Sequence, residues 1–227
     1  MRPVVAVTPL RASGSGGAHV TVVRRDGQPG PSVVLGTGEV LCGRTEGELL
    51  IRDDASVSPR HARFSLEPEG GQVTDLGSVN GTFLRLREPC TLVPGDEIRV
   101  GRQFLRLELV PRPTATPGSS DDGSTPWGSP DRGARLRLAQ LMDGGGLGEV
   151  FPLDPGENYV GREVGSILFP QDRYVSGRHC NIDVSETGVT VTDQGSSNGT
   201  FVRIKGSAPL QAGDQILIGM QLLRFDA

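Results

Sequence analysis

Two stretches of this chain carry the same set of polar residues that can hold an anion. Arg44 is followed by Ser58 and Asn80, and the same residue types return 118 positions later as Arg162, Ser176 and Asn198. The arginine guanidinium is a planar fork of donors that matches the oxygens of a carboxylate or phosphate. A serine hydroxyl adds a neutral donor, and an asparagine amide can pair with an extended backbone. The combination predicts a site for a phosphorylated peptide, since a phosphate brings roughly −1.5 to −2 charges and three strong acceptor oxygens.

A second arginine and a turn recur around each set. Arg60 follows Ser58 by two residues, and Arg178 follows Ser176 by the same interval. A lone surface arginine is by default a solvated charge, and Asn-Gly pairs mark turns in any β-protein because both central residues of a type I′ turn need positive φ. Identical spacing at loop positions in both copies favours binding instead, because binding residues concentrate on the loops of a rigid scaffold.

Catalysis and metal binding fit these residues poorly. Ser58, His61 and Asp75 are the side-chain types of a hydrolase triad, but no Gly-x-Ser-x-Gly elbow and no glycine-rich oxyanion turn accompany the serine. Each copy has one histidine in its repeated motif and no second ligand at the fixed spacing of a metal site. We therefore predict no enzyme activity, no metal and no cofactor.

The charge of the chain restricts its partners. The formal net charge is −4 and aromatic residues make up 4% of the 227 residues, whereas a nucleic-acid surface needs clustered basic residues. Arginine supplies 22 of the 23 basic residues, with Lys205 as the exception. This bias indicates a bacterium with a GC-rich genome. We expect a protein that does not bind nucleic acid.

Cysteine content and hydrophobicity restrict the compartment. The three cysteines form no paired or metal-ligand spacing, which indicates a reducing environment. No apolar run approaches the roughly 18 residues needed to cross a bilayer, and the first ten residues are a poor secretory signal. The expected location is the cytoplasm, without membrane insertion.

An internal repeat sets the domain organisation. Sliding residues 43–106 onto 161–224 needs no gap and gives 28 identities in 64 positions. A repeat of this length with one copy of each motif indicates tandem domains, because solenoid repeats are shorter. The expected organisation is a loose tail (1–17), a first domain (18–110), a flexible linker rich in Pro, Gly, Ser, Thr and Asp (111–133), and a second domain (134–227).

The sequence of each domain predicts a succession of short β-strands. Short β-branched runs such as HVTVV (19–23) and DEIRV (96–100) are separated by Gly, Pro, Asp and Asn. No stretch keeps a 3.6-residue apolar period over ten residues. The pattern predicts an all-β fold with a β-sandwich in each domain.

The ordered motifs Gly-Arg, Ser-x-Arg-His and Asn-Gly resemble those of the forkhead-associated (FHA) domain, once in each repeat. The resemblance covers about 18–110 and 134–227. Each motif alone is weakly specific, but the ordered and duplicated set is strong. The resemblance implies eleven-stranded β-sandwiches that bind phosphothreonine peptides through loops at one end.

The resemblance also assigns roles by position. The arginines and serines would contact the phosphate, the asparagines would bind the peptide main chain, and the histidines and glycines would brace the binding loops. The implied binding residues are Arg44, Ser58, Arg60, Ser78 and Asn80 in the first domain and Arg162, Ser176, Arg178, Ser197 and Asn198 in the second. The implied structural residues are Gly43, His61, Gly81, Gly161, His179 and Gly199.

Two positions differ between the copies. Many family members have Ser or Thr just before the motif asparagine; the second copy has Ser197 there, but the first has Val79. The first site is therefore expected to be weaker, although Ser78 lies close by. The residue two before the motif serine is Ser56 in one copy and Tyr174 in the other, so the two sites are expected to prefer different peptides.

The leading hypothesis is a non-catalytic phosphothreonine-binding adaptor in Ser/Thr-kinase signalling, with a kinase or its substrates as partners. The alternative is a phospho-independent scaffold that docks partners through other faces of its sandwiches. Two sites could capture one doubly phosphorylated ligand or two different phosphoproteins. Self-recognition is a further possibility, because threonines occur in the tail and linker at Thr8, Thr114, Thr116 and Thr125. The sequence does not give the oligomeric state.

Overall fold

The computed structural model describes residues 5–7, 17–24, 26–36, 38–68, 70–111, 122–124 and 133–227. Every regular element in these residues is a β-strand, which confirms the all-β fold predicted from the sequence. No helix long and apolar enough to cross a membrane occurs in this part of the chain. Most of the expected linker, most of the expected tail and the four threonines named above lie outside the described residues.

The strands form two compact units. Unit 1 comprises residues 1–86 and 201–227, and unit 2 comprises residues 87–200. The strands of unit 1 are β1 (Val5–Val7), β2 (His19–Val23), β3 (Pro29–Val34), β4 (Val40–Gly43), β5 (Leu49–Ile51), β6 (Ala62–Glu67), β7 (Gly70–Asp75), β8 (Thr82–Arg85), β19 (Ser207–Leu210), β20 (Gln215–Ile218) and β21 (Gln221–Asp226). The strands of unit 2 are β9 (Cys90–Leu92), β10 (Glu97–Val100), β11 (Gln103–Leu109), β12 (Leu136–Leu141), β13 (Leu147–Leu153), β14 (Gly156–Gly161), β15 (Ile167–Leu168), β16 (Cys180–Ser185) and β17 (Gly188–Asp193). Strand β18 (Thr200–Arg203) begins at the last residue of unit 2, and its Phe201–Arg203 segment pairs with β8 in unit 1.

Unit 1 has two sheets around a common core. One sheet has the strand order β1-β5-β4-β6-β7-β19, and the other includes β8-β20-β21-β2-β3. Its core contains Val20 and Phe64 from the first repeat with Ile216 and Phe225 from the second, each at most 1% exposed. The strand β1 falls in the segment expected to be a loose tail, but its backbone pairs with β5, which extends the first sheet by one edge strand.

Unit 2 repeats this arrangement with strands from the other halves of the repeats. One sheet has the order β15-β14-β16-β17-β9, and the other includes β13-β12-β11-β10. Leu105 and Leu107 from the first repeat are fully buried, as are Leu138 and Ile182 from the second. The alternation of buried and exposed residues along β11 and β21 follows the period of two expected for strands with one face on a core.

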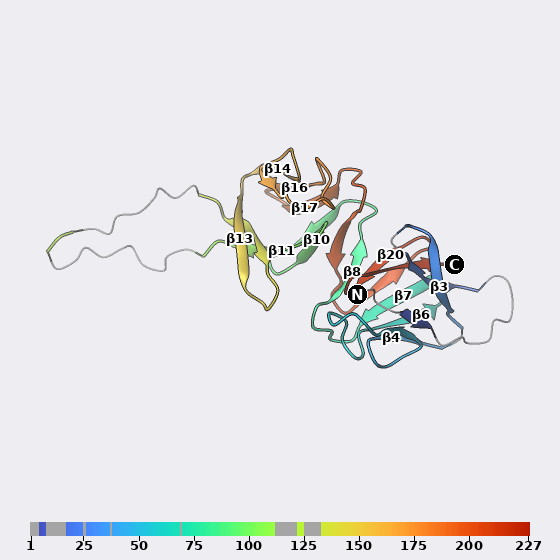
Figure 1. The fold of residues 1–227 in the computed structure, drawn as a ribbon. Coiled ribbons are helices and arrows are strands. Elements are labelled where there is room, and N and C mark those ends of the chain that lie inside the picture. The colour runs from blue at the N-terminus through green and yellow to red at the C-terminus, as the bar shows by residue number, and fades with distance from the viewer. Residues whose placement is uncertain are drawn as a thin grey trace. The chain divides into compact units, whose positions relative to one another are not determined.

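The units therefore exchange the last strands of the two repeats. In unit 1, β2 pairs with β21 and β7 pairs with β19 of the second repeat. In unit 2, β12 pairs with β11 and β17 pairs with β9 of the first repeat. Figure 1 shows this in the colours: orange-red β20 lies among blue and cyan strands, and green β10 and β11 lie among yellow and orange ones.

This grouping differs from the continuous domains 18–110 and 134–227 expected from the repeat. Each repeat supplies the same residue pattern at its last strands, with Gly95-Asp96 and Gly213-Asp214 at equivalent positions. Either copy can complete either sandwich, and exchanging equivalent elements is a low-cost rearrangement because it keeps the same types of contact. The exchange makes unit 2 one continuous segment of the chain.

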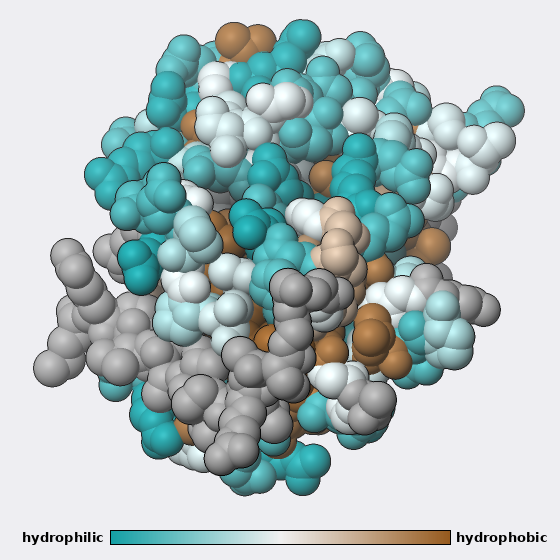
Figure 2. Space-filling model, turned by 90° about the vertical axis from the view of Figure 1, so that its right-hand side faces the viewer, coloured by the Kyte–Doolittle hydropathy of each residue, from teal (hydrophilic) through white to brown (hydrophobic). Residues whose placement is uncertain are grey.

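The surface is mainly polar on the face drawn in Figure 2. Hydrophilic residues predominate there, and hydrophobic residues occur in small areas between them. An extended apolar patch would suggest a docking face. The polar character of this face favours polar loops as its binding elements.

Candidate functional site

The candidate residues of unit 1 lie on three neighbouring loops. Arg44 follows β4, Ser58 lies between β5 and β6, and Asn80 lies between β7 and β8. The backbone N–H of Arg44 donates to the carbonyl oxygen of Ser58 at 2.9 Å, which joins the first two loops. Gly43 allows this close approach, because a Cβ there would lie 2.1 Å from the carbonyl oxygen of Pro59.

A buried histidine joins the second and third loops. His61 is 0% exposed, its Nδ1 accepts the backbone N–H of Ser58 at 3.1 Å, and its Nε2 lies 3.1 Å from the carbonyl oxygen of Gly81. These partners require a neutral ring with the proton on Nε2, which donates to Gly81. Burial lowers the pKa of His61, in agreement with a neutral ring. Through these two bonds His61 connects the second loop to the third.

The serine and asparagine of the site are oriented by further bonds. The hydroxyl oxygen of Ser58 accepts the backbone N–H of Val79 at 3.1 Å, which leaves the hydroxyl hydrogen for another acceptor. The side-chain amide of Asn80 donates to the carbonyl oxygen of Ser56 at 2.7 Å. Asn80 is exposed, so its amide oxygen can still face a ligand.

The two arginines of unit 1 differ in their settings. Arg44 is half-buried, and its Nε donates to the carbonyl oxygen of Val57 at 3.1 Å. This bond holds the guanidinium beside Ser58. Arg60 is exposed and lies 3.9 Å from the carboxylate of Glu46, which is also exposed. Such an exposed pair contributes little stability and can open to a stronger anion.

Unit 2 has the same framework. His179 is 0% exposed. Its Nδ1 accepts the backbone N–H of Ser176 at 3.0 Å, and its Nε2 lies 3.1 Å from the carbonyl oxygen of Gly199. The hydroxyl oxygen of Ser176 accepts the backbone N–H of Ser197, and the Asn198 amide donates to the carbonyl oxygen of Tyr174. Gly161 again admits no side chain, since a Cβ there would lie 2.3 Å from the carbonyl oxygen of Gly177.

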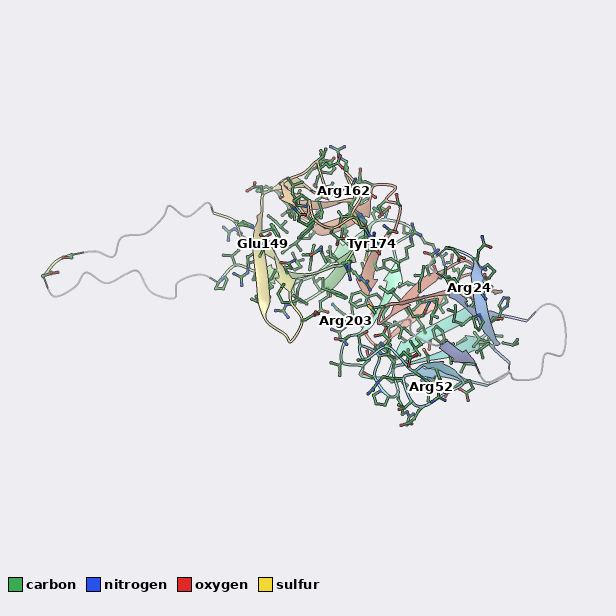
Figure 3. All side chains as sticks on the ribbon, in the orientation of Figure 1. Arg24, Arg52, Glu149, Arg162, Tyr174 and Arg203 are labelled. Atoms are coloured by element: carbon green, nitrogen blue, oxygen red, sulfur yellow. The ribbon has the colours of Figure 1, made fainter. Side chains whose placement is uncertain are left out.

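The arginines of unit 2 have different partners from those of unit 1. Arg162 is half-buried and donates through Nε and Nη2 to the exposed carboxylate of Glu163, at 3.1 and 2.7 Å. The guanidinium of Arg178 lies 3.9 Å from the centre of the Tyr159 ring. Figure 3 labels Arg162 and Tyr174, both on unit 2. The two arginines, the serine and the asparagine of each motif set thus lie on equivalent loops in the two units.

Ser78 does not have the role expected for it. It is 6% exposed, its hydroxyl donates to Asp75 at 2.7 Å, and it accepts the backbone N–H of Gly81 at 2.9 Å. Ser196 makes the equivalent bonds to Asp193 and Gly199 in unit 2. Ser78 is therefore the counterpart of Ser196 and part of the loop framework, and it does not replace Ser197.

Each loop framework also contains a half-buried carboxylate, Asp75 or Asp193, whose structural role we did not predict from the sequence. Asp75 accepts hydrogen bonds from Ser78 and Thr82, and Asp193 accepts them from Ser196 and Thr200. Burial raises the pKa of Asp75, but the hydrogen bonds from Ser78 and Thr82 outweigh it, so the net pKa is lowered. The signal was present as Asp-x-x-Ser-x-x-x-Thr in both copies.

The geometry also bears on the two other kinds of site considered from the sequence, a hydrolase triad and a metal site. In unit 1 the Asp75 carboxylate binds hydroxyl groups, while the Nδ1 of His61 accepts a backbone N–H of Ser58 rather than its hydroxyl hydrogen. A triad needs the histidine between carboxylate and hydroxyl. Among the described residues, no group of three or more His, Cys, Asp or Glu side chains could hold a metal ion.

Comparison with known proteins agrees with the motif analysis. Residues 40–101 and 158–219 each match the FHA domain family, and these ranges together cover more than half of the chain. The chain therefore belongs to the FHA family and carries two FHA domain sequences in tandem.

Relatives of the chain include proteins of Mycobacterium and Corynebacterium species. The glycogen accumulation regulator GarA of Mycobacterium tuberculosis is 37% identical over 112 residues, covering 48% of this chain and 65% of GarA. The oxoglutarate dehydrogenase inhibitor of Corynebacterium diphtheriae is 36% identical over 102 residues, covering 44% of this chain and 69% of the inhibitor. The match to GarA thus spans just under two thirds of that protein's length.

Solved structures of FHA domains are also similar to parts of the chain. One comes from a structural and functional analysis of phosphothreonine-dependent FHA domain interactions. It is 28% identical, covers 40% of this chain and 96% of that chain, and has a TM-score of 0.26.

Proposed function

We propose that the chain is a non-catalytic adaptor that binds phosphothreonine-containing proteins in Ser/Thr-kinase signalling. The observation that carries the proposal is the donor set that each unit holds on its braced loops. In unit 1, Arg44, Ser58 and Asn80 lie on loops that hydrogen bonds join, and His61 bonds to the backbone of Ser58 and of Gly81. Their counterparts Arg162, Ser176 and Asn198 lie on the loops braced by His179 in unit 2.

The chemistry of each set suits a phosphorylated threonine in an extended peptide. The arginine supplies charge-assisted hydrogen bonds to the phosphate, and the serine hydroxyl adds a neutral one. The exposed asparagine supports binding of the peptide main chain because its amide can both donate and accept. Arg60 and Arg178 are exposed and add positive charge beside the same loops.

The relatives support a regulatory role. GarA is named as a regulator of glycogen accumulation, and the corynebacterial relative is named as an inhibitor of oxoglutarate dehydrogenase. Regulation through binding requires no catalytic group in the regulator. The proposed partners are therefore threonine-phosphorylated proteins, such as a Ser/Thr kinase or its substrates.

Titration of the full chain with matched phosphorylated and unphosphorylated threonine peptides tests the proposal. A charge-assisted hydrogen bond contributes about 1.5–3 kcal/mol, and about 1.4 kcal/mol corresponds to a tenfold change in affinity. We therefore expect Arg162→Ala to weaken the second site by about tenfold or more, and Arg44→Ala to do the same at the first. The matched control is Arg24→Ala, an exposed arginine in unit 1 away from the candidate loops.

Equal binding of the two peptide forms would contradict the proposal and favour the phospho-independent scaffold. Phosphate-dependent binding that survives the combined Arg44→Ala and Arg162→Ala changes would place the phosphate elsewhere.

A further inference from the structure

A turn from the first repeat packs against the binding loops of the second. Gly101 and Arg102 lie between β10 and β11, inside unit 2. The backbone N–H of Arg102 donates to Asp172 at 2.8 Å, and the side chain of Gln103 donates to the same carboxylate oxygen at 2.7 Å. The fit is close, since a Cβ on Gly101 would lie 3.0 Å from the carbonyl carbon of Tyr174. The strand exchange thus fixes Arg102 next to a loop of the other repeat.

Arg102 forms a cationic cluster with two residues of that loop. Its guanidinium lies 5.8 Å from the centre of the Tyr174 ring, and that of Arg173 lies 5.0 Å from the same ring. Arg173 also donates to the Tyr174 hydroxyl at 2.9 Å. Both arginines are exposed, and Tyr174 is 38% exposed. Two positive charges therefore lie around one accessible aromatic ring.

This cluster is directly connected to the peptide-binding asparagine. The Asn198 amide donates to the carbonyl oxygen of Tyr174 at 2.8 Å. A peptide main chain held by Asn198 would therefore pass beside Tyr174. A side chain of the peptide would there meet the guanidinium groups of Arg102 and Arg173.

The three equivalent positions in unit 1 carry no cationic residue. Ala55 and Ser56 replace Arg173 and Tyr174, and Met220 of the second repeat replaces Arg102. The backbone N–H of Met220 donates to Asp54 at 2.7 Å, matching the bond from Arg102 to Asp172. Met220 is 61% exposed. The two units share this backbone bond, and at these three positions unit 2 carries two arginines where unit 1 carries none.

We infer that Arg102, although it belongs to the first repeat, determines the peptide specificity of the second site by favouring an acidic side chain after the phosphothreonine. This inference rests on the proposed phosphothreonine binding. An opposing charge beside the cluster is Asp172, which is 6% exposed and accepts bonds from the backbone N–H groups of Arg102 and Tyr174 and from Gln103. Its oxygens are thus turned toward these donors, and the exposed guanidinium groups meet the peptide.

Titrations of the full chain test this inference. The Arg44→Ala background isolates the second site, and the probes are phosphothreonine peptides with Asp or Ala at each of the first four positions after the phosphothreonine. We expect one Asp peptide to bind more tightly than its Ala counterpart. Since exposed ion pairs are weak, Arg102→Ala should reduce this preference by about two- to fivefold. Arg102→Lys should retain most of it, because the positive charge remains.

The Arg162→Ala background gives the reciprocal measurement at the first site. There, Arg102→Ala should leave the affinity unchanged, while Met220→Ala should change it. An unaltered Asp preference of the second site in Arg102→Ala would overturn the inference, as would an effect of Arg102→Ala at the first site alone. Failure of the proposed function looks different, because the parent chain would then bind phosphorylated and unphosphorylated peptides equally.

Discussion

His61 acts on the first site through both of its ring nitrogens. One accepts the N–H that precedes the binding hydroxyl, and the other donates to the turn that carries Asn80. A protonated ring could not accept the bond from Ser58, so the brace needs the neutral form. Among the candidate residues, Asn80 is exposed and Ser58 is half-buried, and this buried histidine joins the loops that carry them.

The stability of unit 1 should therefore depend on pH. Burial lowers the pKa of His61 from the ordinary value of 6.5, so below about pH 6.5 the unfolded chain binds a proton that the folded chain does not. The contribution of His61 to the free energy of unfolding is therefore fully present above this pH, and it is lost as the pH falls below it. Hydrogen exchange of β6 and β8 between about pH 7.5 and 5.5 should show this loss, and His61→Gln should be less stable with a flatter pH dependence. The lowered pKa of Asp75 acts below about pH 3.8, outside this range.

Position 79 should make the two sites differ in affinity. The side chain of Val79 is 82% exposed and has no hydrogen-bond donor, whereas Ser197 in unit 2 presents an exposed hydroxyl group. Ser78 cannot compensate for this in unit 1, because its hydroxyl hydrogen is donated to Asp75. One neutral hydrogen bond is worth about 0.5–1.5 kcal/mol, so the second site should be tighter by a modest factor. Val79→Ser combined with Ser197→Val should narrow or reverse the difference in titrations with one peptide. An unchanged difference would assign it to other residues.

At the scale of elements, most strands were predictable from alternation alone. HVTVV at 19–23 coincides with β2, and DEIRV at 96–100 contains β10. The shortest strand, β15, has two residues, too few to show any period in the sequence. The candidate residues were found because the repeat displayed them twice, and Arg102 was missed because its contact with the second site depends on strand pairing that no local pattern encodes.

The close approach of loops at Gly161 should make this position intolerant of any side chain. A Cβ there would lie 2.3 Å from the carbonyl oxygen of Gly177 and 2.4 Å from that of Val164. Relieving such overpacking costs about 1–3 kcal/mol, so Gly161→Ala should destabilise unit 2 and weaken its phosphopeptide binding. Gly177→Ala is the matched control in the same loops, because its nearest contact is the flexible end of Glu163 at 3.7 Å. Equal behaviour of the two variants would show that the loops can separate without loss of the site.

At the scale of the whole molecule, the repeat leaves two ways to complete each sandwich. Strand β2 can pair with the last strand of its own repeat or with that of the other, and the registers are equivalent because the repeats align without a gap. The sequence alone does not choose between them. In the structure the exchanged pairing makes β11 and β12, which are consecutive along the chain, antiparallel neighbours in unit 2. Sequential strands pair in this way more often than not.

Disulfide trapping in the full chain distinguishes the two pairings. Thr21 lies opposite Arg224 in the exchanged arrangement, and Arg106 is the residue of the first repeat equivalent to Arg224. Directly opposed residues of antiparallel strands have Cα atoms about 4.5–5.5 Å apart, within the range that a disulfide spans. We expect Thr21→Cys with Arg224→Cys to form a disulfide under mild oxidation, and Thr21→Cys with Arg106→Cys to remain reduced.

A Cys90→Ser background removes the one half-buried natural thiol, since Cys42 and Cys180 are fully buried. Both pairs share the same change at position 21, so a general effect of Thr21→Cys cannot produce a difference between them. Intramolecular bonding is read from thiol counts and from mobility under non-reducing conditions at low protein concentration. A disulfide between positions 21 and 106 instead would mean that the domains are continuous, which would also place Arg102 beside the first site. Efficient formation of both bonds would mean that the two pairings interconvert in solution.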